Sequence, residues 1–262
     1  MILDEILSHK RGEIAERARR APIAELTRRA ESEPPAISLA EVLGADGVAL
    51  IAEIKRASPS MGSLAVDLRA EVAARTYLEN GAAAISVLTD ERFFHGTLED
   101  LSAAKRIVGR TLPVLRKDFI VDRYQVVEAR AAGADAVLLI VRTLTWDDLH
   151  ALYAEIVRWG MTPLVEVHDE EEIEPALSLG PTVVGINTRD LSDMSVDLAR
   201  FGRLRACLPD SVIAVAESGI ESAADVERVK RMGANAVLVG SALIQASDLG
   251  GKVRELVLGG AP

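Results

Sequence analysis

Residues 112–119 read Leu112-Pro113-Val114-Leu115-Arg116-Lys117-Asp118-Phe119, a short apolar run that ends in three charged residues before a phenylalanine. A proline opens the run, whose length and composition are those of a buried strand. A strand that is apolar in its middle and ionic at its carboxyl end delivers charge to one edge of a sheet. Several other predicted strands end in the same way, so we expect the fold to bring these ends together.

Short apolar runs of this kind alternate with amphipathic helices from residue 48 onward, with a repeat of about 27 residues. The runs are nearly continuous rather than alternating in polarity, which is typical of parallel strands buried on both faces. The eight predicted strands span residues 48–54, 83–88, 112–116, 135–141, 162–167, 182–187, 211–216 and 235–239.

An internal repeat sets the phase of these units. A glycine followed by alanine recurs at Gly81, Gly133 and Gly233, each time just before a predicted strand. A glycine there can end the preceding helix in the left-handed backbone region, and alanine admits close helix–strand contact. Eight such units without a linker predict an α/β fold, a closed (β/α)8 TIM barrel, rather than an open doubly wound sheet. No Gly-x-Gly-x-x-Gly follows the first strand, which argues against dinucleotide binding.

The first 47 residues differ from the rest of the chain. Ile2, Leu3 and Ile6 lie at helical spacing and lead into an arginine-rich helix, and a second short helix ends at the proline pair 34–35. We expect residues 1–47 to form an N-terminal helical extension capping the barrel and residues 48–262 to form the barrel, in one structural domain overall. The extension is either an amphipathic cover for the core or a lid over a site.

Composition limits the partners of the protein. Of 262 residues, 49% are apolar and only 3% aromatic, and the formal net charge is −10, which argues against binding to nucleic acid or an anionic membrane. The single cysteine, Cys207, cannot form an internal disulfide, and we expect it to be a small core residue on a helix. The sequence shows no signal peptide and no apolar run near the roughly 20 residues of a membrane span, so we expect a cytoplasmic location.

Charged residues gather at the predicted carboxyl ends of the strands, where TIM barrels place their active sites. Glu53 and Lys55 are two residues apart on the first strand and therefore point to the same side. Acids and bases held together in a partly dry pocket perturb each other's pKa, as proton-transfer chemistry requires. The edge combines three cations and three carboxylates: Lys55, Lys117, Arg189, Glu53, Glu166 and Glu217.

The last two strands end in small residues. Ser218 and Gly219 follow the seventh strand, and Gly240 and Ser241 follow the eighth, where a helix is predicted to begin. Backbone N–H groups exposed by such turns, together with a helix N-terminus, bind phosphate at this end of a TIM barrel. A glycine–serine turn alone is also an ordinary helix cap, so the prediction of a phosphate site depends on the pair of turns.

Other candidate residues give weaker signals. The four histidines have no metal-ligand spacing, and His168, although it follows a strand end, favours a loop or capping role. Phe93 and Phe94 are consistent equally with core packing and with an apolar clamp on an aromatic ligand.

Longer motifs surround the strand-end residues. They are Glu53-Ile54-Lys55-Arg56-Ala57-Ser58-Pro59-Ser60, Leu88-Thr89-Asp90-Glu91-Arg92-Phe93-Phe94, Leu115-Arg116-Lys117-Asp118-Phe119-Ile120, Leu164-Val165-Glu166-Val167, Ile186-Asn187-Thr188-Arg189-Asp190-Leu191, Ala216-Glu217-Ser218-Gly219-Ile220 and Val239-Gly240-Ser241-Ala242-Leu243. In this order the set resembles the indole-3-glycerol phosphate synthase family over nearly the whole chain. The combination of the Ser-Pro-Ser loop, Lys-Asp-Phe and Glu-Ser-Gly is highly specific.

The resemblance implies a lyase of tryptophan biosynthesis that needs no cofactor and no metal. A carboxyphenylamino-deoxyribulose phosphate, which is a sugar phosphate with an anthranilate moiety, would close into a ring, lose CO2 and then water, and give indole-3-glycerol phosphate. This reaction fits the residues already identified, because a phosphate needs the small-residue turns, a benzoate carboxylate needs a cation, and dehydration needs an acid and a base.

The resemblance also implies residue roles. Lys117 resembles the general acid of ring closure and Glu166 its acid/base partner, and the sequence leaves open which of Lys55 and Lys117 acts at which step. The remaining implied roles are dehydration by Glu53 and Lys55, orientation of the intermediate by Asn187 and Glu217, carboxylate binding by Arg189, substrate anchoring by Ser58, packing on the anthranilate ring by Phe94, Phe119 and Leu191, and phosphate binding by Lys55, Ser218, Gly219, Gly240 and Ser241.

Two alternatives stay open at the level of sequence. One is another sugar-phosphate barrel enzyme, either an isomerase or an aldolase with Lys117 as a Schiff-base nucleophile. The other is a noncatalytic barrel that binds a phosphate ligand. In each case we expect a small-molecule ligand and a monomer or weak homo-oligomer.

Overall fold

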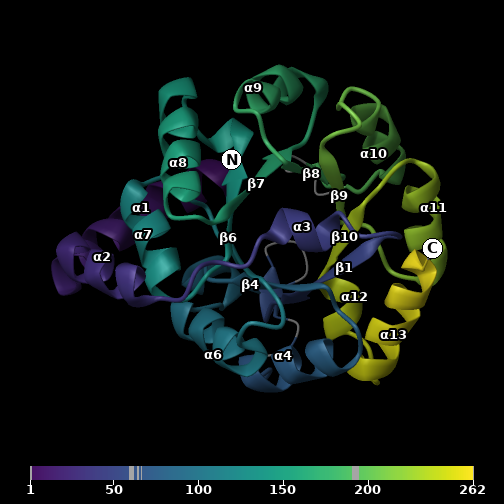
Figure 1. Cartoon of the computed structure of the whole chain (residues 1–262), viewed down its shortest axis with the longest axis horizontal. Coiled ribbons are helices and arrows are strands. Elements are labelled where there is room, and N and C mark those ends of the chain that lie inside the picture. Colours follow the sequence, from purple (N-terminus) through teal and green to yellow (C-terminus); the bar gives the residue numbers. More distant parts are fainter. Residues whose placement is uncertain (1, 59–61, 64, 66, 191–194, 262) are drawn as a thin grey trace.

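A closed barrel of eight parallel strands forms the centre of the protein. The computed structural model describes residues 2–58, 62–63, 65, 67–190 and 195–261. The strands follow the order β1-β10-β9-β8-β7-β6-β5-β4 around the barrel, and helices surround it (Figure 1). This confirms the predicted (β/α)8 TIM barrel. The barrel strands are β1 (Ala49–Ile54), β4 (Ala84–Leu88), β5 (Val114–Lys117), β6 (Ala136–Ile140), β7 (Thr162–Val167), β8 (Val183–Asn187), β9 (Ile213–Glu217) and β10 (Ala236–Val239).

Helices follow the strands as the repeat predicted. They are α4 (Ala70–Glu79), α5 (Glu91–Phe94), α6 (Leu98–Val108), α7 (Arg123–Ala131), α8 (Trp146–Arg158), α9 (Ile173–Ser178), α10 (Leu198–Arg205), α11 (Ala223–Arg231), α12 (Ser241–Ile244) and α13 (Leu249–Gly260), with 3-10 turns at Val141–Thr143 and Glu170–Glu172. The sequence pattern missed one element, a short antiparallel hairpin of β2 (Ala57–Ser58) and β3 (Gly62–Ser63) after the first strand.

The three repeat glycines have the backbone geometry that the sequence predicted. Gly81, Gly133 and Gly233 have φ values of 93°, 91° and 92° and each follows the C-cap residue of its helix, α4, α7 and α11 respectively. A side chain in that left-handed region costs free energy, because Cβ approaches the backbone. Each glycine therefore ends a helix sharply and turns the chain into the next strand.

The inside of the barrel is a packed core. Side chains of the strands, among them Ile51, Leu115 and Leu164, form one buried cluster, and Leu39 and Leu43 of α3 (Leu39–Leu43) belong to it. The backbone N–H of Leu39 donates to Thr162 Oγ1 at the start of β7, at 3.1 Å. The helix α3 therefore closes the amino end of the barrel (Figure 1).

The other N-terminal helices lie outside the barrel. Helices α1 (Ile2–Arg20) and α2 (Ile23–Ser32) lie beside α7, where Ile14 and Leu26 pack with Tyr124 and Val127. The Tyr124 hydroxyl donates to the carbonyl oxygen of Ala21 at 3.0 Å. The N-terminal segment thus contacts the barrel along α7 and at the amino end, and the first turns of α1 also reach the carboxyl end, where Lys10 pairs with Asp90 and Asp118.

The first barrel strand joins segments that are far apart in the chain. β1 pairs with β4 on one side and with β10 on the other, where Ala49 lies opposite Ala236. The N–H of Val48 also donates to the carbonyl oxygen of Gly260 in α13, at 2.8 Å. The barrel is therefore closed between its first and last strands.

Two further observations concern the surface and the helices. The prediction for Cys207 is wrong, because this residue is exposed in the turn after α10 rather than packed in the core. Among the described residues, no helix combines the length and the apolar character that crossing a membrane requires.

Candidate active site

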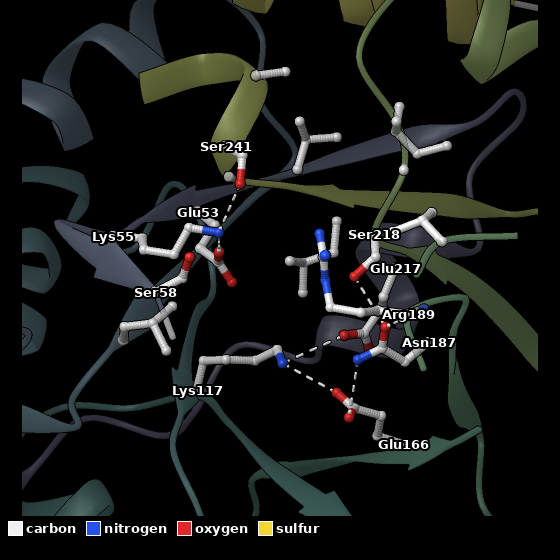
Figure 2. A pocket seen from close by; sticks show the side chains of 18 of the residues that line it. Glu53, Lys55, Ser58, Lys117, Glu166, Asn187, Arg189, Glu217, Ser218 and Ser241 are labelled. Atoms are coloured by element: carbon white, nitrogen blue, oxygen red, sulfur yellow. Dashed lines mark hydrogen bonds and ion pairs between the residues drawn. The ribbon is translucent and has the colours of Figure 1, made fainter. Parts of the chain in front are cut away.

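A cavity of about 550 Å³ opens at the carboxyl ends of the barrel strands. The structure brings together in its wall all but one of the residues predicted as the site, and Figure 2 shows how most of their side chains lie. The exception, Leu191, lies outside the described residues. The predicted residues that line the cavity are Glu53, Lys55, Ser58, Phe94, Lys117, Phe119, Glu166, Asn187, Arg189, Glu217, Ser218, Gly219, Gly240 and Ser241.

Lys117 stands between two carboxylates at the end of β5. Its Nζ lies 3.0 Å from Glu166 Oε2 at β7 and 3.4 Å from Glu217 Oε2 at β9 (Figure 2). Burial lowers the pKa of Lys117, but attraction to Glu166 and Glu217 outweighs it, so the pKa is raised. Lys117 is therefore a protonated ammonium held in the cavity wall.

The carboxyl groups of Glu166 and Glu217 are buried together, and their pKa values are shifted in opposite directions. Burial raises the pKa of Glu166, but the charges of Lys117 and His168 outweigh it and lower the pKa to about 2. The pKa of Glu217 is raised well above its usual value by burial and by the neighbouring Glu166 charge. The pKa values of these two neighbouring carboxyl groups are thus shifted in opposite directions, which is the arrangement that acid–base chemistry uses.

A glycine makes room for this pair. Gly185 on β8 lies between β7 and β9 and pairs with Glu166 in the ladder. A Cβ at this position would collide with Glu217 Oε1. Gly185 was not predicted as a site residue, although a glycine in the middle of an apolar strand often marks a close approach of another group.

Asn187, at the end of β8, connects Ser218 to Glu166. Its amide nitrogen donates to Glu166 Oε1 at 3.3 Å, and its oxygen accepts hydrogen bonds from the Ser218 hydroxyl at 2.9 Å and from the Arg189 backbone at 3.1 Å. These contacts fix the orientation of the amide. Ser218 and Gly219 both have positive φ, 68° and 74°, in the tight turn after β9.

A second ionic cluster lies at the ends of β1 and β10. Lys55 Nζ lies 3.1 Å from Glu53 Oε1 and donates to the Ser241 hydroxyl oxygen at 3.1 Å (Figure 2). Helix α12 begins at Ser241, directly after Gly240. The cation, the hydroxyl group and the glycine come together at the place where the sequence predicted a phosphate site.

Gly240 has no room for a side chain. A Cβ there would collide with Glu53 Oε1 and lie 3.1 Å from Lys55 Nζ. We expect Gly240→Ala to displace this ion pair and to lower kcat/KM by up to about 10²-fold, because small misplacements of reacting groups are costly. Steady-state kinetics check this, with Gly12→Ala on α1 as the control because its Cβ would meet no atom within 4 Å. Equal losses in both variants would contradict the explanation.

Two aromatic rings form an apolar part of the cavity wall. Phe94 on α5 and Phe119 after β5 have ring centroids 6.2 Å apart with their planes tilted by 43°. Phe93 instead packs edge-on against His9 of α1, at 6.1 Å. Of the two neighbours that the sequence left undecided, Phe94 therefore faces the cavity.

Several residues that contribute to the site were not predicted from the sequence. Leu3 and Ile6 of α1 line the cavity, and the helical spacing that predicted an amphipathic helix was the signal that could have identified them.

His168 is buried, with Nε2 3.3 Å from Glu166 Oε1 and Nδ1 3.5 Å from Glu172 Oε2. It follows Glu166 by two residues, so the strand period of two could have placed it beside that carboxylate. No cluster of His, Cys, Asp or Glu among the described residues is arranged to hold a metal ion.

Fold and cavity together define a class, the (β/α)8-barrel enzymes whose active sites lie at the carboxyl ends of the strands. The family model described as indole-3-glycerol phosphate synthase matches residues 3–256. The chain belongs to the indole-3-glycerol phosphate synthase family.

Relatives in sequence and in structure support this assignment. The chain is 48% identical to an indole-3-glycerol phosphate synthase of Roseiflexus sp. (strain RS-1), over 97% of each chain, and 44% identical to one of Mycobacterium avium (strain 104), over 99% of this chain and 94% of the relative. A solved structure of 3-hexulose-6-phosphate synthase from Salmonella typhimurium superposes with a TM-score of 0.66 at 15% identity, covering 81% of this chain and 98% of that chain. At that identity, the structural likeness bears on the fold alone.

Proposed function

We propose that the cavity converts 1-(2-carboxyphenylamino)-1-deoxyribulose 5-phosphate into indole-3-glycerol phosphate, CO2 and water. The observation that carries this proposal is that two ionic clusters line the same cavity. The Lys117–Glu166–Glu217 cluster lies on one side, and the Lys55–Glu53 cluster lies beside Ser241 on the other. The family makes the chain a carboxy-lyase of tryptophan biosynthesis. The roles of individual residues below are our proposals.

Ring closure needs an acid at the ketone of the substrate. Lys117 is suited to this role because Glu166 and Glu217 keep it protonated while its Nζ reaches the cavity. As the ring carbon attacks, the ketone oxygen takes a proton from Lys117, and loss of CO2 then restores the aromatic ring. Glu166 acts as acid/base partner of Lys117 and relays to it a proton taken up from water, which replaces the proton left on the product, while Asn187 and Glu217 orient and polarise the intermediate.

Dehydration requires an acid for the leaving hydroxyl group and a base for a proton of the new ring. We assign Lys55 and Glu53 to this step, because their side chains lie 3.1 Å apart and both line the cavity. The proton that leaves with water is balanced by the proton removed from the ring. The same Lys55 Nζ reaches Ser241, so it also assists phosphate binding.

The remaining residues bind the two ends of the substrate. Phe94 and Phe119 pack on the anthranilate ring, Arg189 pairs with its carboxylate, and Ser58 anchors the substrate beside Lys55. Leu191 is proposed from sequence alone as a further contact to the ring. The phosphate is bound by Ser218, Gly219, Gly240 and Ser241, whose turns end β9 and β10.

The proposal is tested by a fluorescence assay for indole-3-glycerol phosphate with the purified protein and the carboxyphenylamino substrate. Turnover supports the proposal, and its absence in the folded protein would contradict it. A Schiff-base aldolase mechanism predicts that borohydride traps a carbonyl substrate on Lys117. The raised pKa of Lys117 counts against that mechanism, because an imine forms from the neutral amine.

Salt is expected to weaken substrate binding. The protein has a net charge of −10, so attraction of the doubly anionic substrate depends on the cations of the cavity. The Debye length falls from about 30 Å at 0.01 M salt to about 3 Å at 1 M. We therefore expect KM to rise with added NaCl at constant pH, as measured by initial rates. A KM that does not change with salt would contradict the electrostatic argument.

Domain organisation, oligomeric state and location are also proposals. We propose that residues 1–47 cap a barrel formed by residues 48–262, and that the protein is a cytoplasmic monomer or weak homo-oligomer. Exposed large apolar side chains among the described residues are few and are spread over several elements, such as Val72 on α4, Trp146 and Val157 on α8 and Leu258 on α13. Sedimentation velocity tests the oligomeric state, and fractionation of the source cells tests the location.

A further inference from the structure

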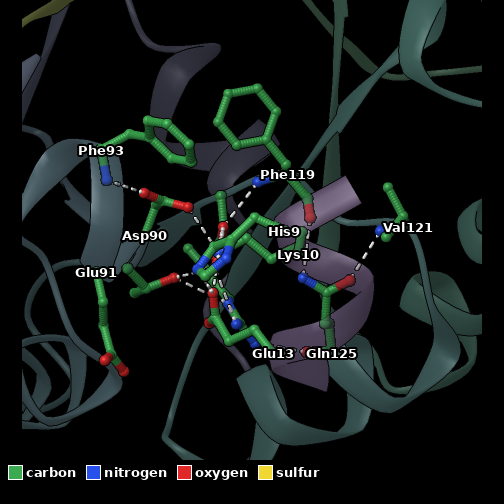
Figure 3. A network of polar contacts seen from close by, with 12 residues as sticks. His9, Lys10, Glu13, Asp90, Glu91, Phe93, Phe119, Val121 and Gln125 are labelled. Atoms are coloured by element: carbon green, nitrogen blue, oxygen red, sulfur yellow. Dashed lines mark hydrogen bonds and ion pairs between the residues drawn. The ribbon is translucent and has the colours of Figure 1, made fainter. Parts of the chain in front are cut away.

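A buried cluster of ions lies behind the aromatic wall of the cavity. At its centre is Lys10 of α1, whose side chain is 1% exposed. Its Nζ lies 2.8 Å from Asp90 Oδ2, 3.0 Å from Asp118 Oδ1 and 3.1 Å from Glu13 Oε2 (Figure 3). Lys10 thus joins α1 to two segments that are separate in the barrel, the start of α5 and the end of β5.

The contact with Asp118 connects Lys10 to one of the two rings. Asp118 follows Lys117, and its Oδ1 accepts the backbone N–H of Phe119 at 2.8 Å. Its Oδ2 accepts hydrogen bonds from Thr89 at 2.7 Å and from the fully buried Arg116 at 3.0 Å. Burial raises the pKa of Asp118, but the charges of Lys10 and Arg116 outweigh it and lower the pKa to about 2.

The contact with Asp90 connects Lys10 to the other ring. Asp90 is the N-cap of α5, and its Oδ1 accepts the backbone N–H of Phe93 at 2.7 Å. Its Oδ2 is buried, makes no hydrogen bond of good geometry, and faces Lys10 Nζ. Helix α5 has only four residues, so its orientation depends strongly on this cap, and it carries Phe94 next to Phe93.

We infer that Lys10 is a positioning residue that sets the separation of Phe94 and Phe119, and so the width of the space that takes an aromatic ring. The inference rests on the proposed function, because it assigns that ring to the anthranilate end of the substrate. Lys10 lies on α1, and the same helix brings Leu3 and Ile6 to the cavity. Docking of α1 therefore shapes the aromatic part of the site directly.

Removal of the Lys10 side chain should affect ligand binding at one end of the cavity only. The phosphate end is built from Lys55, Gly240 and Ser241 on β1, β10 and α12, and none of the contacts of Lys10 reaches these residues. Loss of Lys10 leaves two buried carboxylates without their shared cation, which forces Asp90 and Asp118 to move apart or take up protons. A loosened aromatic space weakens binding of the ring and leaves phosphate binding unchanged.

The test compares the two ends of the substrate as separate probes. In Lys10→Met, we expect KM for the whole substrate to rise about tenfold or more with a smaller change in kcat, because binding energy of the ring is lost. Calorimetric affinity for anthranilate should fall by a similar factor, whereas affinity for glycerol 3-phosphate should not change. Lys10→Arg keeps the cation and should recover part of the anthranilate affinity. Arg20→Met removes an exposed cation of the same helix and is the matched control.

A second variant separates positioning from stability. Lys10→Met combined with Asp90→Asn removes the cation together with one carboxylate, and asparagine can still cap α5. We expect the double variant to be thermally more stable than Lys10→Met alone but to bind anthranilate no more tightly. Unchanged anthranilate affinity in a folded Lys10→Met protein, or an equal loss for both probes, would overturn the inference. If the wild type binds both probes without turnover, the proposed function fails while the positioning role is still measured.

Discussion

Replacing Lys117 with alanine is expected to lower kcat by about 10³-fold or more, because a positioned general acid contributes roughly 10²–10⁴-fold and here the same group also balances buried charge. Without its ammonium, nothing protonates the ketone as the ring closes. Glu166 and Glu217 also lose the cation that lies 3.0 and 3.4 Å away. The negative charge of Glu166 then faces the developing oxyanion. The assay is the rise of indole-3-glycerol phosphate fluorescence under saturating substrate.

The control for this variant is Lys252→Ala, which removes a lysine paired with Glu255 on the outer helix α13. It should retain the wild-type rate. Thermal unfolding measured in parallel shows whether the loss of activity is a loss of structure. Turnover that survives in Lys117→Ala would assign the acid to Lys55 instead, and Lys55→Ala would then show the large loss.

Replacing Glu166 with glutamine is expected to lower kcat by about 10²-fold or more, since the variant keeps the shape of the side chain but has no titratable group. Glutamine cannot relay a replacement proton to Lys117, and it carries no negative charge that would stabilise the Lys117 ammonium group. Asn187, which donates to Glu166 Oε1, would keep a hydrogen-bond acceptor and so its orientation. We expect KM to change less than kcat, because the interaction acts in the chemical step.

The control for Glu166 is Glu174→Gln on α9, an exposed carboxylate of the same βα unit. It should behave like the wild type. The noncatalytic alternative predicts that neither Lys117→Ala nor Glu166→Gln changes more than ligand binding. A Glu166→Gln rate within threefold of the wild type would exclude Glu166 as the acid/base partner.

The sequence predicted the barrel and the position of its site because both depend on local pattern. A parallel barrel places every strand's carboxyl end at the same rim, so a residue such as Lys117 or Glu166 can be assigned to the site from strand phase alone. The Gly81, Gly133 and Gly233 repeat fixed that phase.

Other features depend on contacts between distant segments, which periodicity does not encode. Lys10 meets Asp118 across more than a hundred residues, and a lysine on an amphipathic helix usually points to solvent. The opposite pKa shifts of Glu166 and Glu217 result from burial and from the positions of the two side chains relative to each other and to Lys117. The error at Cys207 has a local origin, because α10 ends at Arg205 and leaves Cys207 exposed in the turn that follows.

The pairing of β1 with β10 also has a consequence for biosynthesis. A ribosome synthesises β1 more than 180 residues before its partner strand β10 at residues 236–239. Until then, the open edges of the growing sheet and the apolar lining around Ile51 and Leu164 stay accessible to other nascent chains. We expect the barrel to close only after β10 has been synthesised, so that chaperone protection is needed throughout the interval between β1 and β10.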